Sequence, residues 1–189
     1  MATSIQNINL IDLSSRNPKI KYGCARDLLA IAKGSPSELY PHIDHFVELL
    51  DSENSILRWT AIDVIGLLSK VDEEGKVDKL MGKLSGLLNT GNMITANHAI
   101  AALTDIAVSK PEFQNKITAE LLKVEHYDYD TDECRNIALG KVILALGSYS
   151  DQLEDKKTVV EFVRRQTENT RNATRKKAEQ FLRKVGKGK

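Results

Sequence analysis

The sequence predicts an all-α protein, built as an α-solenoid of about five two-helix repeats. Apolar residues recur at helical spacing along almost the whole chain of 189 residues. No segment of useful length alternates with the period of two that is typical of strands. Turn-forming and helix-capping residues interrupt the helical pattern at even intervals, and a short motif returns at a nearly constant spacing.

Turn and N-cap residues divide the chain into about ten helical segments. Asn17 and Asn54 are typical N-cap residues, Pro18 favours the first turn of a helix, and Gly34 favours a helix end. Breaks of this kind occur at residues 17–18, 34–36, 51–54, 91–92, 110–111, 129–132 and 169–170. The expected helices therefore cover residues 4–13, 18–33, 37–50, 54–70, 75–89, 93–108, 112–124, 132–148, 152–167 and 170–185.

Apolar residues lie on one face of each expected helix. In the third helix, Ile43, Phe46, Val47 and Leu50 follow the spacing i, i+3, i+4, i+7. Similar stripes occur in the fifth and seventh helices, at Leu80, Leu84, Leu87 and Leu88, and at Ile117, Leu121 and Leu122. Because one helix pair cannot bury such a stripe alone, successive pairs must stack.

Every second helix carries a related motif: a basic residue, a small residue three positions later, and an apolar residue four positions after that. The small residues lie 37, 38, 39 and 40 positions apart, a period found in helical repeat arrays. A small side chain allows neighbouring helices to approach closely, and we expect the apolar residue to pack between repeats. The copies are Lys21 with Cys24 and Leu28, Arg58 with Ala61 and Ile65, Ala96 with Ala99 and Leu103, Arg135 with Ala138 and Val142, and Arg175 with Ala178 and Leu182.

The chain resembles HEAT-repeat proteins over nearly its whole length. The second repeat is the most typical, with Pro41 in its first helix, an acidic turn at 51–54, and Leu57 and Arg58 opening its second helix. The third repeat departs most, because Ala96 stands where a basic residue is expected. The resemblance implies a right-handed superhelix whose second helices line a concave binding surface. It gives one domain, 1–189, with repeats at about 4–34, 35–72, 73–110, 111–149 and 150–186.

The formal net charge of +1 hides an uneven distribution. Residues 156–189 carry 12 Lys and Arg against three Asp and Glu, whereas the first 155 residues carry 15 basic and 23 acidic side chains. A basic last repeat indicates either an anionic partner, such as nucleic acid, or simply a solvated terminal helix. We expect Arg175 to bond within the stack, as the repeat arginine usually does. The candidate anion-binding residues are Arg171, Lys177, Arg183 and Lys184.

One position of the second helices forms a candidate row for a protein partner. Trp59 is the only tryptophan, and Asp63 follows it at i+4, so both side chains share a helix face. We expect a non-enzymatic scaffold that holds a protein partner on this row, although a half-buried Trp that fills space between repeats is the simpler explanation for Trp59. The predicted partner-binding residues are Tyr22, Trp59, Asp63, Asn97, Asn136 and Lys176.

The alternative function is nucleic-acid binding through the basic last repeat. A Trp and an Asp on one helix also resemble HEAT-like DNA glycosylases, in which aromatic residues and an Asp flank the damaged nucleotide. No second Trp occurs at the equivalent positions of the later repeats, which makes base-excision chemistry the weaker alternative.

No catalytic, cofactor or metal site is expected. His42 and His45 lie at i, i+3 with Glu48 nearby, but the other histidines fall in different repeats. The acidic run 128–133 lacks the glycine and the final glutamate of an EF-hand loop. Two cysteines without a paired motif, no long apolar run and no signal-like start favour a cytoplasmic protein. The oligomeric state is left open.

Overall fold

The structure, a computed structural model, describes residues 9–186. Within this range every regular element is a helix, which confirms the all-α prediction. No helix among these residues is both long and apolar enough to cross a membrane. The chain divides into two compact units, Met1–Leu80 and Met81–Lys189. The boundary falls inside the third predicted repeat, 73–110, so the single domain expected from the sequence stays a prediction.

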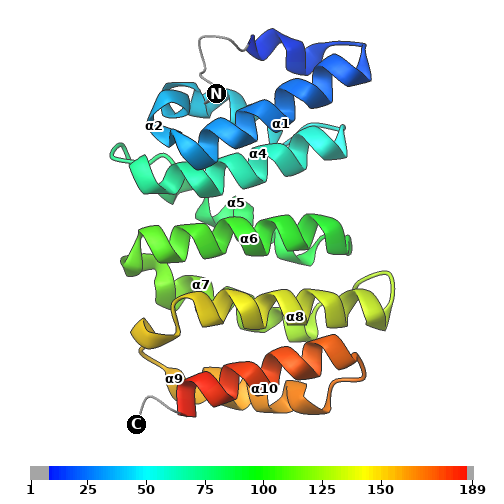
Figure 1. Cartoon of the computed structure of the whole chain (residues 1–189), viewed down its shortest axis with the longest axis vertical. Coiled ribbons are helices and arrows are strands. Elements are labelled where there is room, and N and C mark those ends of the chain that lie inside the picture. Colours follow the sequence, from blue (N-terminus) through cyan, green and yellow to red (C-terminus); the bar gives the residue numbers. More distant parts are fainter. Residues whose placement is uncertain (1–8, 187–189) are drawn as a thin grey trace. The chain divides into compact units, whose positions relative to one another are not determined.

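Unit 1 is built around two long helices, α1 and α4, which pack side by side (Figure 1). Both begin at an Asn N-cap: the Asn17 side chain accepts from the backbone N–H of Lys19, and that of Asn54 accepts from Ile56 and Leu57. The short α3 packs against α4. The elements are η2 (Leu10–Ser14), α1 (Pro18–Gly34), α2 (Pro36–Leu39), η3 (Tyr40–His42), α3 (Ile43–Leu49), α4 (Ser55–Leu68), η4 (Ser69–Val71) and η5 (Asp78–Leu80).

Unit 2 repeats this design along the chain. Its long helices α6, α8 and α10 lie side by side in sequence order, with α8 in the middle (Figure 1). The shorter α5, α7 and α9 each precede a long helix. The elements are α5 (Met81–Gly86), η6 (Leu87–Asn89), α6 (Met93–Ser109), η7 (Pro111–Phe113), α7 (Gln114–Leu122), η8 (Lys123–His126), α8 (Asp132–Ser148), η9 (Ser150–Gln152), α9 (Lys156–Arg165), η10 (Gln166–Glu168) and α10 (Asn172–Gly186).

The first helices of the pairs are shorter than predicted. Segment 37–50 splits into α2, η3 and α3, because Pro41 cannot donate a backbone hydrogen bond and its ring crowds the preceding turn. Segment 75–89 starts late, since Gly75 has a φ of +65° and belongs to a turn. Segment 4–13 yields only η2 within the described residues, and residues 4–8 lie outside them.

The repeated motif forms the centre of both units. All five small residues are buried, from Ala61, Ala99, Ala138 and Ala178 at 0% exposure to Cys24 at 8%. The motif arginines bond to the preceding turn: Arg58 Nη1 donates to the carbonyl of Ser52, and Arg175 Nη1 donates to the carbonyls of Asn169 and Thr170. The expectation that Arg175 bonds within the fold is therefore confirmed. These bonds tie α4 and α10 to the turns that precede them, whereas the Arg135 guanidinium pairs with Asp132 in the first turn of α8.

Candidate partner-binding surfaces

In unit 1, the predicted row places an aromatic side chain on each of two neighbouring helices. Tyr22 on α1 is 36% exposed, and its hydroxyl accepts a 3.3 Å hydrogen bond from the side-chain amide of Asn54, the N-cap of α4. Trp59 and Asp63 on α4 are both half-buried. Tyr22 thus combines a bond that joins α1 to α4 with a ring that still reaches solvent.

In unit 2, the predicted row is broken at Asn136. This side chain is only 9% exposed, and its amide donates to Thr170 Oγ1 and accepts from Asn169 Nδ2, both at 2.9 Å. These bonds tie α8 to the turn before α10. The Asn136 amide therefore satisfies its hydrogen bonds inside the fold, as a buried amide must, and its contact with a partner stays a prediction that these bonds do not favour. Of the other two members, Lys176 is exposed and Asn97 is half-buried.

Most of the predicted anion-binding side chains hold α10 in place. Arg171 Nε donates to the Glu133 carboxylate at 2.7 Å, and Lys184 Nζ donates to the carbonyl of Gly147 in the last turn of α8 at 2.9 Å. Burial, with Lys141 and Arg171 nearby, lowers the pKa of Lys177. Arg183 is exposed, and its Nε donates a 3.3 Å hydrogen bond to the backbone carbonyl of Glu179 in the same helix. The four residues do not form one free basic patch.

Large apolar side chains are exposed along the long helices of unit 2. On α6, Ile94 is 43% and Val108 is 51% exposed, and the exposed Ala101 lies midway between them at the same seven-residue spacing. On the adjacent α8, Leu144 is 49% exposed. We call Ile94, Ala101, Val108 and Leu144 the second-helix face of unit 2. Large exposed apolar side chains on one surface can mark an interaction site, so this face is the candidate surface of unit 2.

A shallow groove of about 310 Å³ runs between α8 and α10 beside Leu144. Its wall contains Ile143 and Phe181, and Lys177 and Lys184 stand at its edge. The lining residues are Ile143, Leu144, Gly147, Ser148, Lys177, Gln180, Phe181 and Lys184. Four of these eight lining residues are polar or charged, so the groove offers both apolar and polar contacts to a partner.

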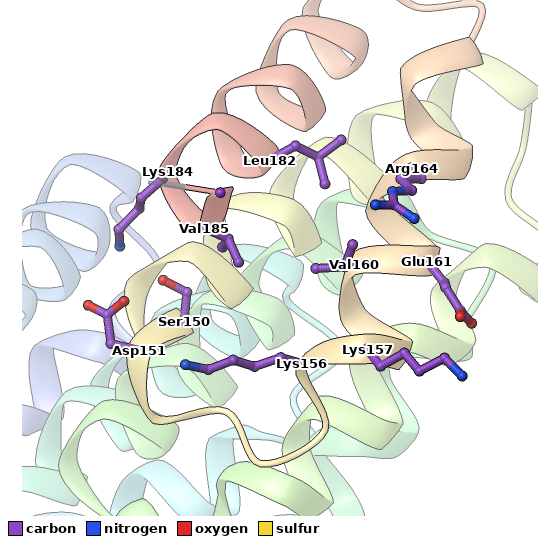
Figure 2. A pocket seen from close by; sticks show the side chains of 11 residues that line it. Ser150, Asp151, Lys156, Lys157, Val160, Glu161, Arg164, Leu182, Lys184 and Val185 are labelled. Atoms are coloured by element: carbon purple, nitrogen blue, oxygen red, sulfur yellow. The ribbon is translucent and has the colours of Figure 1, made fainter. Parts of the chain in front are cut away.

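A larger groove of about 760 Å³ lies between α9 and α10 (Figure 2). Sequence reasoning missed it, although the basic pair Lys156 and Lys157 at the start of α9 was a usable signal. Val160 and Leu182 approach one another across it, and Arg164 stands at one end (Figure 2). The lining residues are Ser150, Asp151, Lys156, Lys157, Val160, Glu161, Arg164, Leu182, Lys184, Val185 and Gly186.

The residues with catalytic or metal-binding side chains are scattered. Among residues 9–186, no group of three or more His, Cys, Asp or Glu side chains is arranged to hold a metal ion. His42 is exposed, whereas the half-buried His45 lies edge-on to Phe46. In the acidic run 128–133, the Thr131 side chain accepts from Cys134 N–H and caps α8.

Burial makes Cys24 an unreactive thiol. Cys24 is only 8% exposed. Its burial, together with the nearby carboxylates of Asp12 and Asp27, raises the pKa of its thiol to about 11. Because the fold favours the neutral thiol, Cys24 contributes its full share of the free energy of unfolding below the pKa of an unfolded thiol, which is about 8.5. This share is lost as the pH rises through the folded pKa of about 11.

We therefore expect one fast and one slow thiol in a titration with Ellman's reagent at a pH of about 8, below the pKa of a free thiol. Cys134, which is half-buried, should react in the native protein, whereas Cys24 should react only on unfolding. The variant Cys134→Ser should abolish the fast phase. Two equally fast thiols in the native protein would contradict this assignment.

The comparisons with known proteins concern the fold alone. No family model matches the chain, and no curated protein matches it. Among solved structures, the crystal structure of an engineered protein from the Northeast Structural Genomics Consortium is similar, with a TM-score of 0.54 and 21% sequence identity. The alignment covers 94% of this chain and 77% of that one. At this level of identity the likeness shows a shared helical fold and carries no function.

Proposed function

We propose that this chain is an α-solenoid of HEAT-like helix pairs that acts as a non-enzymatic scaffold and holds a protein partner on its second helices. The observation that carries the proposal is the second-helix face of unit 2, where Ile94, Val108 and Leu144 are each exposed by more than 40%. Apolar groups of this size gain free energy when a partner covers them, at roughly 25 cal/mol per Å².

The repeat interpretation is supported within each unit separately. In unit 2, packing follows the chain, from α6 to α8 and from α8 to α10. The motif arginine also plays the same part in both units, since Arg58 and Arg175 each donate to a carbonyl six positions upstream. Nearest-neighbour packing of equivalent helix pairs is how solenoids bury their cores.

The second-helix face of unit 2 suits a partner with apolar anchors. Lys177 and Lys184, at the rim of the neighbouring groove, are already committed to α8, Lys177 by burial over Gly140 and Lys184 by its bond to Gly147. Beside these lysines the groove presents the exposed side chain of Leu144, together with the polar side chains of Ser148 and Gln180. Asn97 and Lys176 remain part of the proposed contact surface of unit 2. In unit 1, Tyr22 and Trp59 form a second proposed contact surface.

The nucleic-acid alternative has less support. A phosphate-binding surface needs free cationic groups, and its affinity then weakens steeply as the salt concentration rises. Arg171 instead pairs with Glu133, and Lys184 donates to a helix carbonyl. Binding of DNA or RNA that persists at physiological salt, and that is lost in Lys177→Glu and Arg183→Glu, would favour this alternative over a protein partner.

Quantitative affinity purification of the tagged full chain tests the scaffold proposal. The variants Val108→Asp and Leu144→Asp should each reduce the recovery of the same bound protein by about tenfold, because each substitution places a charge in an apolar contact. Ala119→Asp, an equal charge change at an exposed position of α7, is the matched control and should retain that protein. If every bound protein survives both variants, and also Trp59→Ala and Asn97→Ala, the proposed surfaces are wrong.

A further inference from the structure

The groove between α9 and α10 exposes positions that are buried in every earlier repeat. Leu182 is the apolar residue of the last motif copy and is only half-buried. Its equivalents Leu28, Ile65, Leu103 and Val142 are all 0% exposed. Within the described residues no helix pair follows α10, so nothing there covers this side chain.

The same contrast holds three residues later. Val185 is half-buried, and its equivalents Ile31, Leu68, Ile106 and Ala145 are between 0% and 4% exposed. Together with Val160 of α9, Leu182 and Val185 form an apolar floor in the groove (Figure 2). Two stacking positions left open side by side form a surface shaped to receive a helix.

The rim of this groove is cationic. Lys156, Lys157 and Arg164 line it, and none of them forms an ion pair with another described residue. The adjacent Arg165 shows the contrast, because its guanidinium binds the Glu125 carboxylate at 2.7 Å. Against these three free cations stand the carboxylates of Asp151 and Glu161. The groove thus combines an aliphatic floor with surplus positive charge.

We propose that this groove docks an acidic amphipathic helix of another protein. The apolar stripe of that helix would cover Val160, Leu182 and Val185. Its Asp and Glu side chains would pair with Lys156, Lys157 and Arg164. Charge complementarity of this kind speeds association and selects among apolar helices.

Two other occupants fit the groove less well. Nucleic acid binding favours aromatic side chains for base stacking, whereas the lining residues include none, and Asp151 and Glu161 would repel phosphates. A second copy docking by its first repeat would bring like charges together, since residues 9–35 carry five basic and two acidic side chains. An acidic helix avoids both conflicts.

The probe for this proposal is a labelled synthetic peptide of about 12 residues, three helical turns, with Leu at i, i+3, i+4 and i+7 and Glu elsewhere. Fluorescence anisotropy with the full chain should show saturable binding. The double variant Lys156→Glu with Arg164→Glu should weaken it by about tenfold or more, and Leu182→Asp should do the same. The matched control is Lys116→Glu, an exposed lysine of α7, which should change the Kd less than about twofold.

Four further measurements test the docking of an acidic amphipathic helix. Leu182→Gln, which changes polarity with little change in size, should weaken binding while circular dichroism shows an unchanged helical spectrum. A scrambled peptide of the same composition should bind about tenfold more weakly, because its leucines no longer share a face. Equal binding of the scrambled peptide, or displacement by an oligonucleotide of equal charge, would overturn the proposal in favour of a simple anion site. Self-association lost in Arg164→Glu would overturn it in favour of a second copy.

Discussion

Replacing Leu103 with alanine should destabilise the protein by about 3 kcal/mol. Leu103 is the apolar residue of its motif copy and is 0% exposed on α6, which packs against α5, α7 and α8. The substitution removes the end of a buried side chain and leaves a cavity that the surrounding helices fill only in part. Urea unfolding followed by circular dichroism measures the loss.

The matched control for Leu103→Ala is Leu182→Ala, the same substitution at the same motif position of the same unit. Leu182 is half-buried beside an open groove, so its truncation creates no closed cavity. We expect a cost of about 1 kcal/mol. Equal costs at the two positions would contradict the conclusion that Leu182 lacks the cover that its equivalents have.

Replacing Gly140 with alanine should destabilise the contact between α8 and α10, with a net cost of about 2 kcal/mol. A Cβ at Gly140 would lie 2.9 Å from Thr174 Oγ1 and 3.3 Å from Lys177 Nζ. The lysine can move, but Thr174 is fully buried and donates to the carbonyl of Asn136 at 2.7 Å. The added methyl group must therefore break that bond or push the helices apart.

Gly147→Ala is the control for Gly140→Ala, because both glycines lie in α8. A Cβ at Gly147 would meet Phe181 at an ordinary contact distance of 3.7 Å. Its replacement should be neutral, or stabilising by up to about 1 kcal/mol through helix propensity.

A double-mutant cycle isolates the contact between the two helices. Thr174→Ala removes the atom that Gly140→Ala would strike, so the double variant should be more stable than the sum of the single losses predicts. The coupling is measured from urea midpoints of the four proteins. A coupling of zero would place the cause of the Gly140 effect elsewhere.

Features set by local chemistry were predictable from the sequence. Asn17 and Asn54 were identified as N-caps because a short amide side chain can accept from the first free backbone N–H groups of a helix. Ala61 and Ala138 were expected inside because small residues recur where helices must approach closely, and both are fully buried. These inferences require only the residues adjacent in the sequence and the spacing of the repeated motif.

The candidate surfaces depended on contacts between residues far apart in the chain. Asn136 looked like part of a binding row, yet Asn169 and Thr170 bond to its amide from 33 and 34 positions away. Arg171 looked free, yet Glu133 at the start of α8 pairs with it. No local rule states which polar side chain will find a partner across a helix contact.

The sequence by itself determined the all-helical class, the positions of the long helices and the buried small residues, since these follow from side-chain size, capping and periodicity. The tertiary structure alone decided which basic side chains are free and which apolar ones stay uncovered. Val142 and Leu182 occupy the same place in the motif, and only the packing around them makes one a core residue and the other the floor of a groove. Burial is a property of neighbours that folding brings together, and the repeated motif in the sequence does not specify those neighbours.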